Sequence, residues 1–222
     1  MVHVIIGSDF HVPFHDRKRV QKFLSVLKSE KPDAVVLLGD VVDYYSLSRF
    51  LKIDQSVSLK REINTTKLLL SRINACISKE TKVYYIAGNH EQRLEKYLLT
   101  KAPELYGIES LTVPGMLGLS TFKIKYVDYN DDLKIDGVVY RHGDFVRKKS
   151  GMTAHAHLES YGENIVIGHC HRLALVHRIV GTRFQFGMET GCLCQKLDYV
   201  HRPDWCRGYG IVSDGKPAIK RI

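Results

Sequence analysis

The stretch VHVIIGSDFH, residues 2–11, decides how the chain is interpreted, because it joins an apolar strand to two polar side chains. Residues 2–6 form a mostly apolar run that ends at Gly7, which is typical of a strand buried in a sheet. Asp9 and His11 follow directly. Residues i and i+2 of an extended segment point the same way, so we expect these two side chains to converge.

The same pattern, an apolar strand followed by glycine beside Asp, Asn or His, recurs along the chain. Ligands bind beyond the carboxyl ends of strands in open α/β sheets, so we expect the groups after the strands to meet at one edge. The five groups are Gly7-Ser8-Asp9-Phe10-His11, Gly39-Asp40-Val41-Val42-Asp43, Gly88-Asn89-His90-Glu91, Arg141-His142-Gly143-Asp144 and Gly168-His169-Cys170-His171.

The first half of the chain alternates strands and helices. Strands are expected at residues 2–6, 34–38 and 82–87, and each is followed by glycine. Helical apolar spacing indicates helices at Asp16–Glu30 and Ser58–Ile77. Such a βαβ series predicts a mainly parallel sheet.

The second half is expected to be richer in antiparallel strands. We predict one helix, Met152–Tyr161, and two hairpins, which turn at Gly181-Thr182 and at Asp214-Gly215-Lys216. The fold class expected for both halves together is α/β, with two stacked mixed β-sheets flanked by helices. The remaining predicted strands are Phe122–Val127, Leu133–Ile135, Val138–Arg141, Asn164–Gly168, Leu173–Val180, Arg183–Met188, Tyr209–Ser213 and Pro217–Ile222.

Composition and charge narrow the classes of protein. The 222 residues are 44% hydrophobic and 26% charged, which excludes disordered, collagen-like and coiled-coil proteins. The apolar runs are too short to span a bilayer, and residues 2–6 follow no basic region, so we expect neither a membrane partner nor a secretory signal. A net charge of +9 favours nucleic acid, nucleotides or other phosphorylated partners.

The cysteines are interpreted as reduced thiols of a cytoplasmic protein. Their number is odd, and we expect no secretory signal. Cys192 and Cys194 form C-x-C, which is neither the redox C-x-x-C nor a paired zinc knuckle, so both are expected to be packing residues. The five are Cys76, Cys170, Cys192, Cys194 and Cys206.

The polar groups after the strands have the composition of a metal centre. A mixed Asp, Asn and His set suits borderline divalent ions such as Mn²⁺, Fe²⁺, Zn²⁺ or Ni²⁺. Seven candidate ligands exceed what one ion takes, and they fit two ions that share a carboxylate. The candidates are Asp9, His11, Asp40, Asn89, His142, His169 and His171.

The ordered motifs D-x-H, G-D-x-x-D, G-N-H-E, H-G and G-H-x-H resemble those of the calcineurin-like metallophosphoesterase superfamily. They run from Asp9 to His171, and the local runs SDFHVPFHD (8–16) and GNHEQR (88–93) look like small phage and bacterial members. The resemblance implies one domain over residues 1–222 with a four-layer αββα sandwich. It also implies a metal-dependent phosphoric ester hydrolase of the cytoplasm, or of the host cytoplasm if the protein is phage-encoded.

The resemblance assigns roles to the candidate residues. Two divalent ions are implied, Mn²⁺ being the expected one and Fe, Zn or Ni the alternatives. His90 would lie at the substrate with Asn89, as general acid or phosphate ligand, while a metal-bridging hydroxide attacks phosphorus. Asp9, His11 and His171 would bind the first ion, Asp40 would bridge both, and Asn89, His142 and His169 would bind the second.

One departure bears on the substrate. Protein Ser/Thr phosphatases carry G-D-x-V-D-R-G, whereas Asp43 is followed here by Tyr44 and Tyr45. The resemblance therefore favours phosphodiester bonds of nucleotides or nucleic acid as substrate. A phosphomonoesterase with the same metal site is the alternative, and a non-catalytic nucleic-acid-binding module is a third hypothesis. Natural substrate and oligomeric state stay open.

Further residues near the motifs receive provisional roles. Asp43 is expected to orient a metal-binding histidine. Tyr44 and Tyr45 are either core residues or a stacking surface for a base, and Arg93 and Arg147 either touch phosphate or are solvated. Six histidines are expected to lie outside the site: His155 and His157 at the surface of a helix, and His3, His15, His177 and His201 without a ligand pattern.

Overall fold

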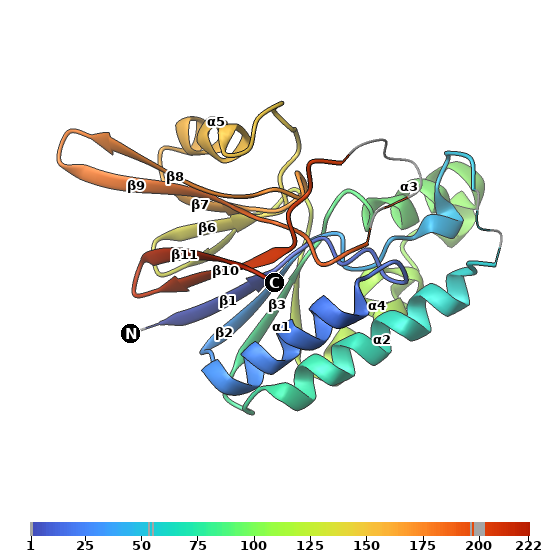
Figure 1. Cartoon of the computed structure of the whole chain (residues 1–222). Helices are drawn as coiled ribbons and strands as arrows, with labels where there is room; N and C mark the ends of the chain where they lie inside the picture. Colours follow the sequence, from blue (N-terminus) through green and yellow to red (C-terminus); the bar gives the residue numbers. More distant parts are fainter. Residues whose placement is uncertain (1, 53, 55, 196, 198–202) are drawn as a thin grey trace.

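Two β-sheets pack face to face in the computed structural model, which describes residues 2–52, 54, 56–195, 197 and 203–222 (Figure 1). One helix covers the outer face of one sheet, and the remaining helices cover the other sheet. This four-layer arrangement confirms the expected fold class.

The first sheet has the strand order β11-β10-β1-β2-β3-β4. The strands β1, β2, β3 and β4 are parallel neighbours, and the hairpin β10–β11 pairs antiparallel with β1. The strands are β1 (His3–Gly7), β2 (Ala34–Leu38), β3 (Lys82–Ile86), β4 (Ile124–Val127), β10 (Gly208–Ser213) and β11 (Lys216–Arg221).

The second sheet has the order β5-β6-β7-β9-β8. Its three central strands, β6, β7 and β9, are parallel, and only the edge strands β5 and β8 run antiparallel to their neighbours. The second half is antiparallel-rich as expected, since β5, β8, β10 and β11 all pair antiparallel with their neighbours. The sequence did not predict that the centre of the second sheet is parallel. The strands are β5 (Leu133–Ile135), β6 (Val138–Arg141), β7 (Asn164–Ile167), β8 (Leu173–Val180) and β9 (Arg183–Thr190).

Side-chain capping fixes where the two long helices begin. The Asp16 carboxylate accepts from the backbone N–H groups of Lys18 and Arg19, and the Ser58 hydroxyl accepts from that of Arg61. The α-helices are α1 (Arg17–Glu30), α2 (Leu59–Cys76), α3 (Gln92–Lys101), α4 (Val113–Leu117) and α5 (Met152–Tyr161). The short 3₁₀ turns are η1 (Tyr45–Leu47), η2 (Pro103–Leu105), η3 (Glu109–Leu111) and η4 (Leu119–Phe122).

The alternation of side chains along β1 divides the core into two. Val4 and Ile6 pack between the two sheets, while Ile5 points into the layer beneath the helices. All three are buried. Because both faces of this strand are covered, it is apolar at nearly every position, and its polar residues are displaced to the segment after its carboxyl end.

The sequence did not predict α3 and α4. The hairpin β10–β11 was predicted, but not its place beside β1, where Ser213 lies opposite His3. Within the described ranges, no helix combines the length and the apolar character needed to cross a membrane.

Candidate metal centre

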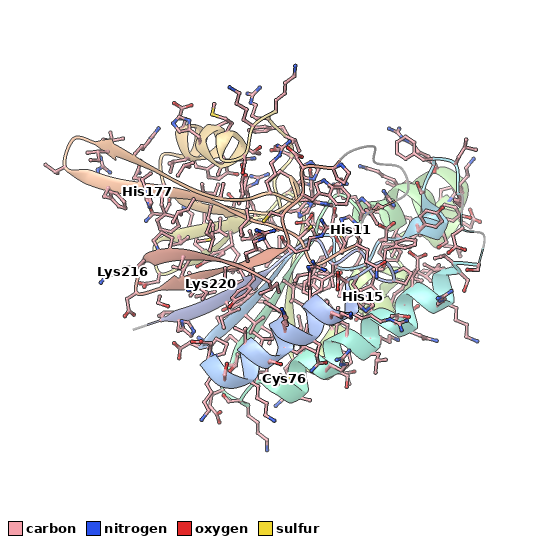
Figure 2. All side chains as sticks on the ribbon, in the orientation of Figure 1. His11, His15, Cys76, His177, Lys216 and Lys220 are labelled. Carbon is pink, nitrogen blue, oxygen red and sulfur yellow. The ribbon has the colours of Figure 1, made fainter. Side chains whose placement is uncertain are left out.

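The segments after five strands converge on one pocket of about 250 Å³. His11 follows β1, Asp40 follows β2, and Asn89 and His90 follow β3, while the second sheet contributes Val146 after β6 and His169 after β7. Figure 2 shows His11 where these strands end, with His177 far away along β8. All seven predicted metal ligands lie in or beside this pocket: Asp9, His11, Asp40, Asn89, His142, His169 and His171.

The prediction that Asp9 and His11 converge because they lie on an extended segment is wrong about the backbone, which is not extended here. The two side chains nevertheless converge. Asp9 and His11 have φ angles of 52° and 48°, in the left-handed region that non-glycine residues seldom occupy. Asp40, His169 and His171 have φ angles of 50°, 64° and 58°. Such strain persists where surrounding structure enforces it, and it is concentrated at functional sites.

Two glycines leave the space that the carboxylates fill. A Cβ atom at Gly88 would lie 2.2 Å from Asp40 Oδ1, and one at Gly168 would lie 2.9 Å from Asp9 Oδ2. A side chain at either position would displace a carboxylate. The glycines that begin G-N-H-E and G-H-x-H are therefore required by packing against the neighbouring strand end.

The first group of candidate ligands surrounds Asp9. His171 Nε2 lies 3.1 Å from Asp9 Oδ1 and 3.1 Å from His11 Nε2. Asp9 Oδ1 is buried and has no hydrogen-bond partner of adequate geometry. Buried polar atoms are almost always satisfied, so an unpartnered carboxylate oxygen beside two imidazole nitrogens fits a site built for a cation.

Asp40 connects this group to a second one. Its Oδ2 lies 3.3 Å from His142 Nε2 and 3.7 Å from both His11 Nε2 and His90 Nε2. Candidate ligand atoms of Asp40, His11 and His90 lie within 4.8 Å of one another, as do those of Asp40, His142 and His169. The donor set therefore fits two divalent ions that share Asp40.

Electrostatics within the pocket are dominated by the two carboxylates. Burial lowers the pKa of His142 and of His171, but the Asp40 and Asp9 carboxylates outweigh burial and raise these pKa values to about 9 and about 10. Burial and the neighbouring His142 lower the pKa of His169 to about 4. The pocket thus attracts positive charge, as a cation site requires.

The ring nitrogens of three histidines that face away from the pocket have partners in the surrounding structure. Asp43 Oδ2 lies 2.9 Å from His11 Nδ1, which places Asp43 where it can orient that ring. His142 Nδ1 donates to the Leu38 carbonyl over 2.9 Å, and His171 Nδ1 faces Cys194 Sγ at 3.9 Å. Such partners fix the tautomer and leave Nε2 to face the pocket.

His90 lies at the pocket with both ring nitrogens in contact with the protein. Its Nδ1 lies 3.0 Å from the Asp43 carbonyl, and its Nε2 accepts from the Arg93 guanidinium over 3.0 Å. Burial lowers the pKa of His90, whereas Asp40 and Asp43 raise it, and the net direction is upward. Arg93, whose role the sequence left open, therefore contacts the site directly.

Glu91 is a positioning residue that sequence reasoning missed. Its buried carboxylate accepts from the backbone N–H groups of Asp40 and Val41 over 2.9 Å each and from that of Gly88 over 2.7 Å. The Tyr85 hydroxyl adds a bond of 2.6 Å. The signal was present as the last residue of G-N-H-E, but nothing local shows that this carboxylate binds another loop.

Several provisional roles are now decided. Tyr44 and Tyr45 are buried in the core, which removes them as a stacking surface. Arg147 lies with its guanidinium over the Phe145 ring. The prediction that His157 is exposed is wrong: it is buried against Phe145, because residues i and i+2 face apart on α5 and one of them must meet the sheet.

The other histidines lie apart from the pocket lining. His155 is half-buried and pairs with Glu159, and His3 contacts Ser213. His15 and His177 do not line the pocket, and His201 lies outside the described residues.

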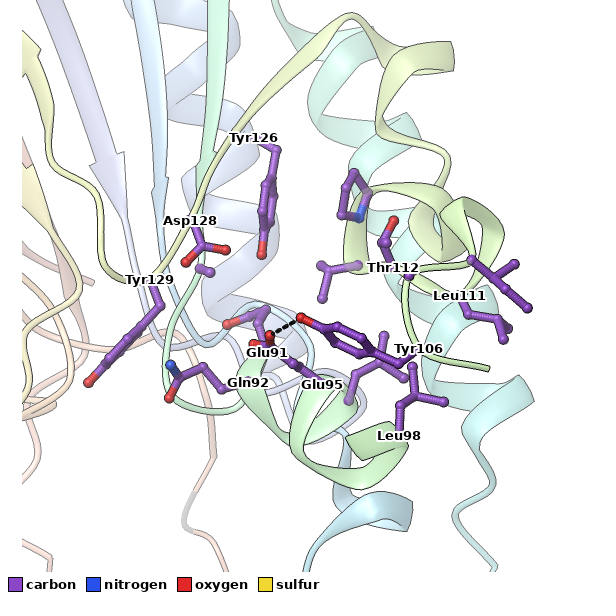
Figure 3. A pocket seen from close by; sticks show the side chains of 16 residues that line it. Glu91, Gln92, Glu95, Leu98, Tyr106, Leu111, Thr112, Tyr126, Asp128 and Tyr129 are labelled. Atoms are coloured by element: carbon purple, nitrogen blue, oxygen red, sulfur yellow. Dashed lines mark hydrogen bonds between the residues drawn. The ribbon is translucent and has the colours of Figure 1, made fainter. Parts of the chain in front are cut away.

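A larger cavity of about 310 Å³ lies beside the metal centre (Figure 3). It is bounded by α3, the segment 106–114 and the end of β4, and it shares Glu91 with the site. Tyrosines and aliphatic side chains dominate its walls, and none of the histidines that the structure describes lines it. The smaller pocket is therefore the candidate site.

Comparisons with known proteins find relatives that align with nearly the whole chain. The chain is 28% identical to the Gene 54 protein of Mycobacterium phage D29, over 99% of this chain and 93% of that protein. It is 27% identical to the Gene 54 protein of Mycobacterium phage L5, over 96% of this chain and 89% of that protein. A solved structure of a Vps29 single mutant from Entamoeba histolytica aligns with a TM-score of 0.49 and 13% identity, over 99% and 98% of the two chains.

A sequence model described as calcineurin-like phosphoesterase matches residues 2–189, most of the chain and every motif that builds the pocket. The chain therefore belongs to the calcineurin-like phosphoesterase family.

Proposed function

We propose that this protein is a dimetal-dependent phosphoesterase that hydrolyses phosphodiester bonds of nucleotides or nucleic acid. The observation that carries the proposal is Asp40, which lies between two groups of candidate ligands at the floor of an open pocket. A carboxylate in that position is what two ions a few Å apart require.

The ligand assignment follows the two groups around Asp40. Asp9, His11 and His171 would hold the first ion, and Asn89, His142 and His169 the second. When bound, two divalent ions would supply positive charge for the phosphate oxygens and lower the pKa of a water molecule that attacks phosphorus.

His90 is proposed as the general acid. Its Nε2 now accepts from Arg93, so this nitrogen carries no proton in the arrangement observed. A substrate phosphate that draws the Arg93 guanidinium towards itself would free Nε2 to take up a proton, and Asp43 would stabilise the resulting imidazolium. His90 could then donate that proton to the leaving oxygen.

A nucleotide as the substrate class is supported by the pocket wall. Trp205, the only tryptophan of the chain, lies with its ring centroid 4.2 Å from that of His171 and lines the pocket beside Arg172. An indole ring beside a phosphate site offers a stacking surface for a base. The excess of Lys and Arg adds attraction for polyanions.

The metal requirement is tested by parallel assays of a nucleoside p-nitrophenyl phosphate diester and p-nitrophenyl phosphate, a monoester. Protein stripped with a chelator should be inactive, and Mn²⁺, Co²⁺ or Zn²⁺ should restore hydrolysis, with the diester preferred. Turnover by metal-free protein would contradict the dimetal mechanism. A preference for the monoester would favour the phosphomonoesterase alternative, and no hydrolysis with any ion would favour a binding module.

The nucleotide preference is tested separately with Trp205→Ala and the conservative Trp205→Phe. The KM for the nucleoside diester should rise about tenfold in Trp205→Ala, because stacking contributes about 1–3 kcal/mol per base. Trp205→Phe should recover most of this loss. Methyl p-nitrophenyl phosphate, which has no base, is the matched control substrate, and an equal rise for both diesters would remove Trp205 from base recognition.

A further inference from the structure

Two buried thiols lie beside the first group of candidate ligands. Cys194 Sγ faces His171 Nδ1 at 3.9 Å, and Cys192 lies against both Cys194 and His171. Both cysteines are free and fully buried. Their prediction as packing residues did not anticipate this position next to two metal-binding histidines.

The backbone holds these thiols in place from two sides. Leu193, between the two cysteines, donates its N–H to the Asp9 carbonyl over 3.1 Å. Cys192 donates to the Cys206 carbonyl, and Cys206 in turn donates to the carbonyl of His171 over 2.9 Å. The C-x-C segment is therefore tied to both loops that carry the first group of ligands.

Cys194 is close enough to join that group. Ligand atoms of His11, His171 and Cys194 all lie within 4.8 Å of one another. Zinc–nitrogen distances of about 2.0–2.1 Å and zinc–sulfur distances of about 2.3 Å require tetrahedral ligand atoms somewhat closer than this. Closing the gap requires the Cys194 side chain to rotate, so that Sγ leaves the Nδ1 side of His171 and approaches the ion position that Nε2 faces. The unpartnered buried Asp9 Oδ1 points to a cation at that place.

We propose that Cys194 supplies a sulfur ligand at the first metal position, beside His11 and His171, so that this position selects a thiophilic divalent ion over Mn²⁺. The proposal rests on the dimetal site proposed above and names the ion class for one half of it. A thiolate favours Zn²⁺, Co²⁺ or Fe²⁺, whereas the second position, with its Asn89 oxygen, remains open to Mn²⁺. Binding would release the thiol proton to solvent.

The test is a titration of metal-free wild-type protein with Co²⁺, monitored by absorption. We expect d–d bands together with a near-ultraviolet sulfur-to-cobalt charge-transfer band that saturates at one equivalent. In Cys194→Ser the charge-transfer band should disappear while d–d bands remain, and Zn²⁺ affinity should fall at least about tenfold. Cys192→Ser should keep the band.

Cys76→Ser is the matched control, because Cys76 lies at the end of α2, far from His11 (Figure 2). X-ray absorption of the zinc-loaded wild type should show one sulfur at about 2.3 Å, and this measurement decides the question if Cys194→Ser fails to fold. Cobalt d–d bands without a charge-transfer band would overturn the role of Cys194 while leaving the dimetal proposal intact. A band lost only in Cys192→Ser would also overturn it, and no cobalt binding would contradict both proposals.

Discussion

At the scale of single residues, Asp40 is the side chain on which both halves of the pocket depend. One oxygen faces three imidazole nitrogens, while the other accepts from the His90 backbone N–H over 2.9 Å. Each metal position would otherwise be completed by residues of its own. A change at Asp40 should therefore affect both ions, whereas a change at a terminal ligand should affect one.

Asp40→Asn keeps the size of the side chain and removes its charge. We expect the variant to lose at least one of two bound ions and turnover to fall by at least about 100-fold. Loss even of a residue that only hydrogen-bonds a metal ligand lowers metal affinity or activity by about 10–100-fold. Metal content after dialysis and steady-state rates measure both effects. The exposed Asp131→Asn is the control. Two tightly bound ions with a near-normal rate would show that Asp40 does not bridge.

His90 should act on the leaving group and not on metal content. His90→Ala should lower turnover by about 10²–10⁴, the usual range for one general acid. The loss should be largest for a diester with an alkyl leaving group, because nitrophenolate departs without a proton. His155→Ala is the control, since that half-buried side chain lies on α5. An equal loss for both leaving groups, or loss of an ion, would contradict the acid role.

Among the elements, Glu91 holds together two loops at the carboxyl edge of the first sheet. Its carboxylate binds the backbone that follows β2 and the start of the turn after β3. Four backbone N–H groups share one acceptor group, since Val42 donates over 3.2 Å as well. Since these four bonds join the loop after β2 to the turn after β3, the relative position of the two loops depends on this carboxylate.

Glu91→Gln replaces one acceptor oxygen with an amino group that faces buried donors. We expect the free energy of unfolding to fall by about 3 kcal/mol, since each buried donor left unpaired costs about 1–3 kcal/mol. Urea denaturation of the metal-free protein measures this loss. Glu95→Gln, on the exposed side of α3, should change stability by less than about 0.5 kcal/mol. Similar values for both variants would remove Glu91 from this role.

Helix α5 makes the free energy of unfolding depend on pH through its residue His157. Burial lowers its pKa to about 4, below the value near 6.5 of an unfolded chain. The unfolded state therefore takes up the proton first as pH falls, so stability is lost between about pH 6.5 and pH 4. Urea midpoints of His157→Gln should decline less over this window than those of the wild type. His155→Gln is the control, and parallel curves for His157→Gln and the wild type would contradict the assignment.

How far the sequence predicts these elements depends on the range of the contacts involved. Strand β6 and helix α5 match their predicted bounds, because apolar spacing and flanking turn residues are local signals. The pairing of β10 with β1 joins Ser213 to His3, and no local pattern encodes which edge a hairpin selects. Helix α3 was missed because it begins at Gln92, directly behind the motif that drew the interpretation towards a loop.

The same distinction holds for the site. Its predicted ligands follow strands, and the strand-end rule places them together without knowledge of side-chain contacts. Glu91 and Cys194 contact loops distant in sequence, so only the folded chain shows these partners. Left-handed backbone at Asp9 and His11 was also unpredictable, because ordinary residues adopt it only where packing enforces it.

At the scale of the whole molecule, the distribution of charge around the pocket matters more than the net value of +9. Val146 lines the pocket, and the exposed run Arg147, Lys148 and Lys149 follows it directly. Lys216 and Lys220, by contrast, lie on β11, well away from His11 (Figure 2). A polyanion that enters the pocket would meet the first group of basic residues and not the second.

This difference predicts how binding responds to salt. Affinity for a single-stranded oligonucleotide should fall steeply with salt concentration, with a slope of log K against log salt near −0.7 for each phosphate neutralised, and a mononucleotide should give a shallower slope. Fluorescence anisotropy in chelator, which prevents turnover, measures both.

Lys148→Ala combined with Lys149→Ala should reduce the oligonucleotide slope by about 1–2, because each contact contributes roughly one counterion. Lys216→Ala combined with Lys220→Ala should leave it unchanged. Equal slopes for the two ligands, or equal effects of the two double variants, would mean that the basic surface does not guide nucleic acid to the metal centre.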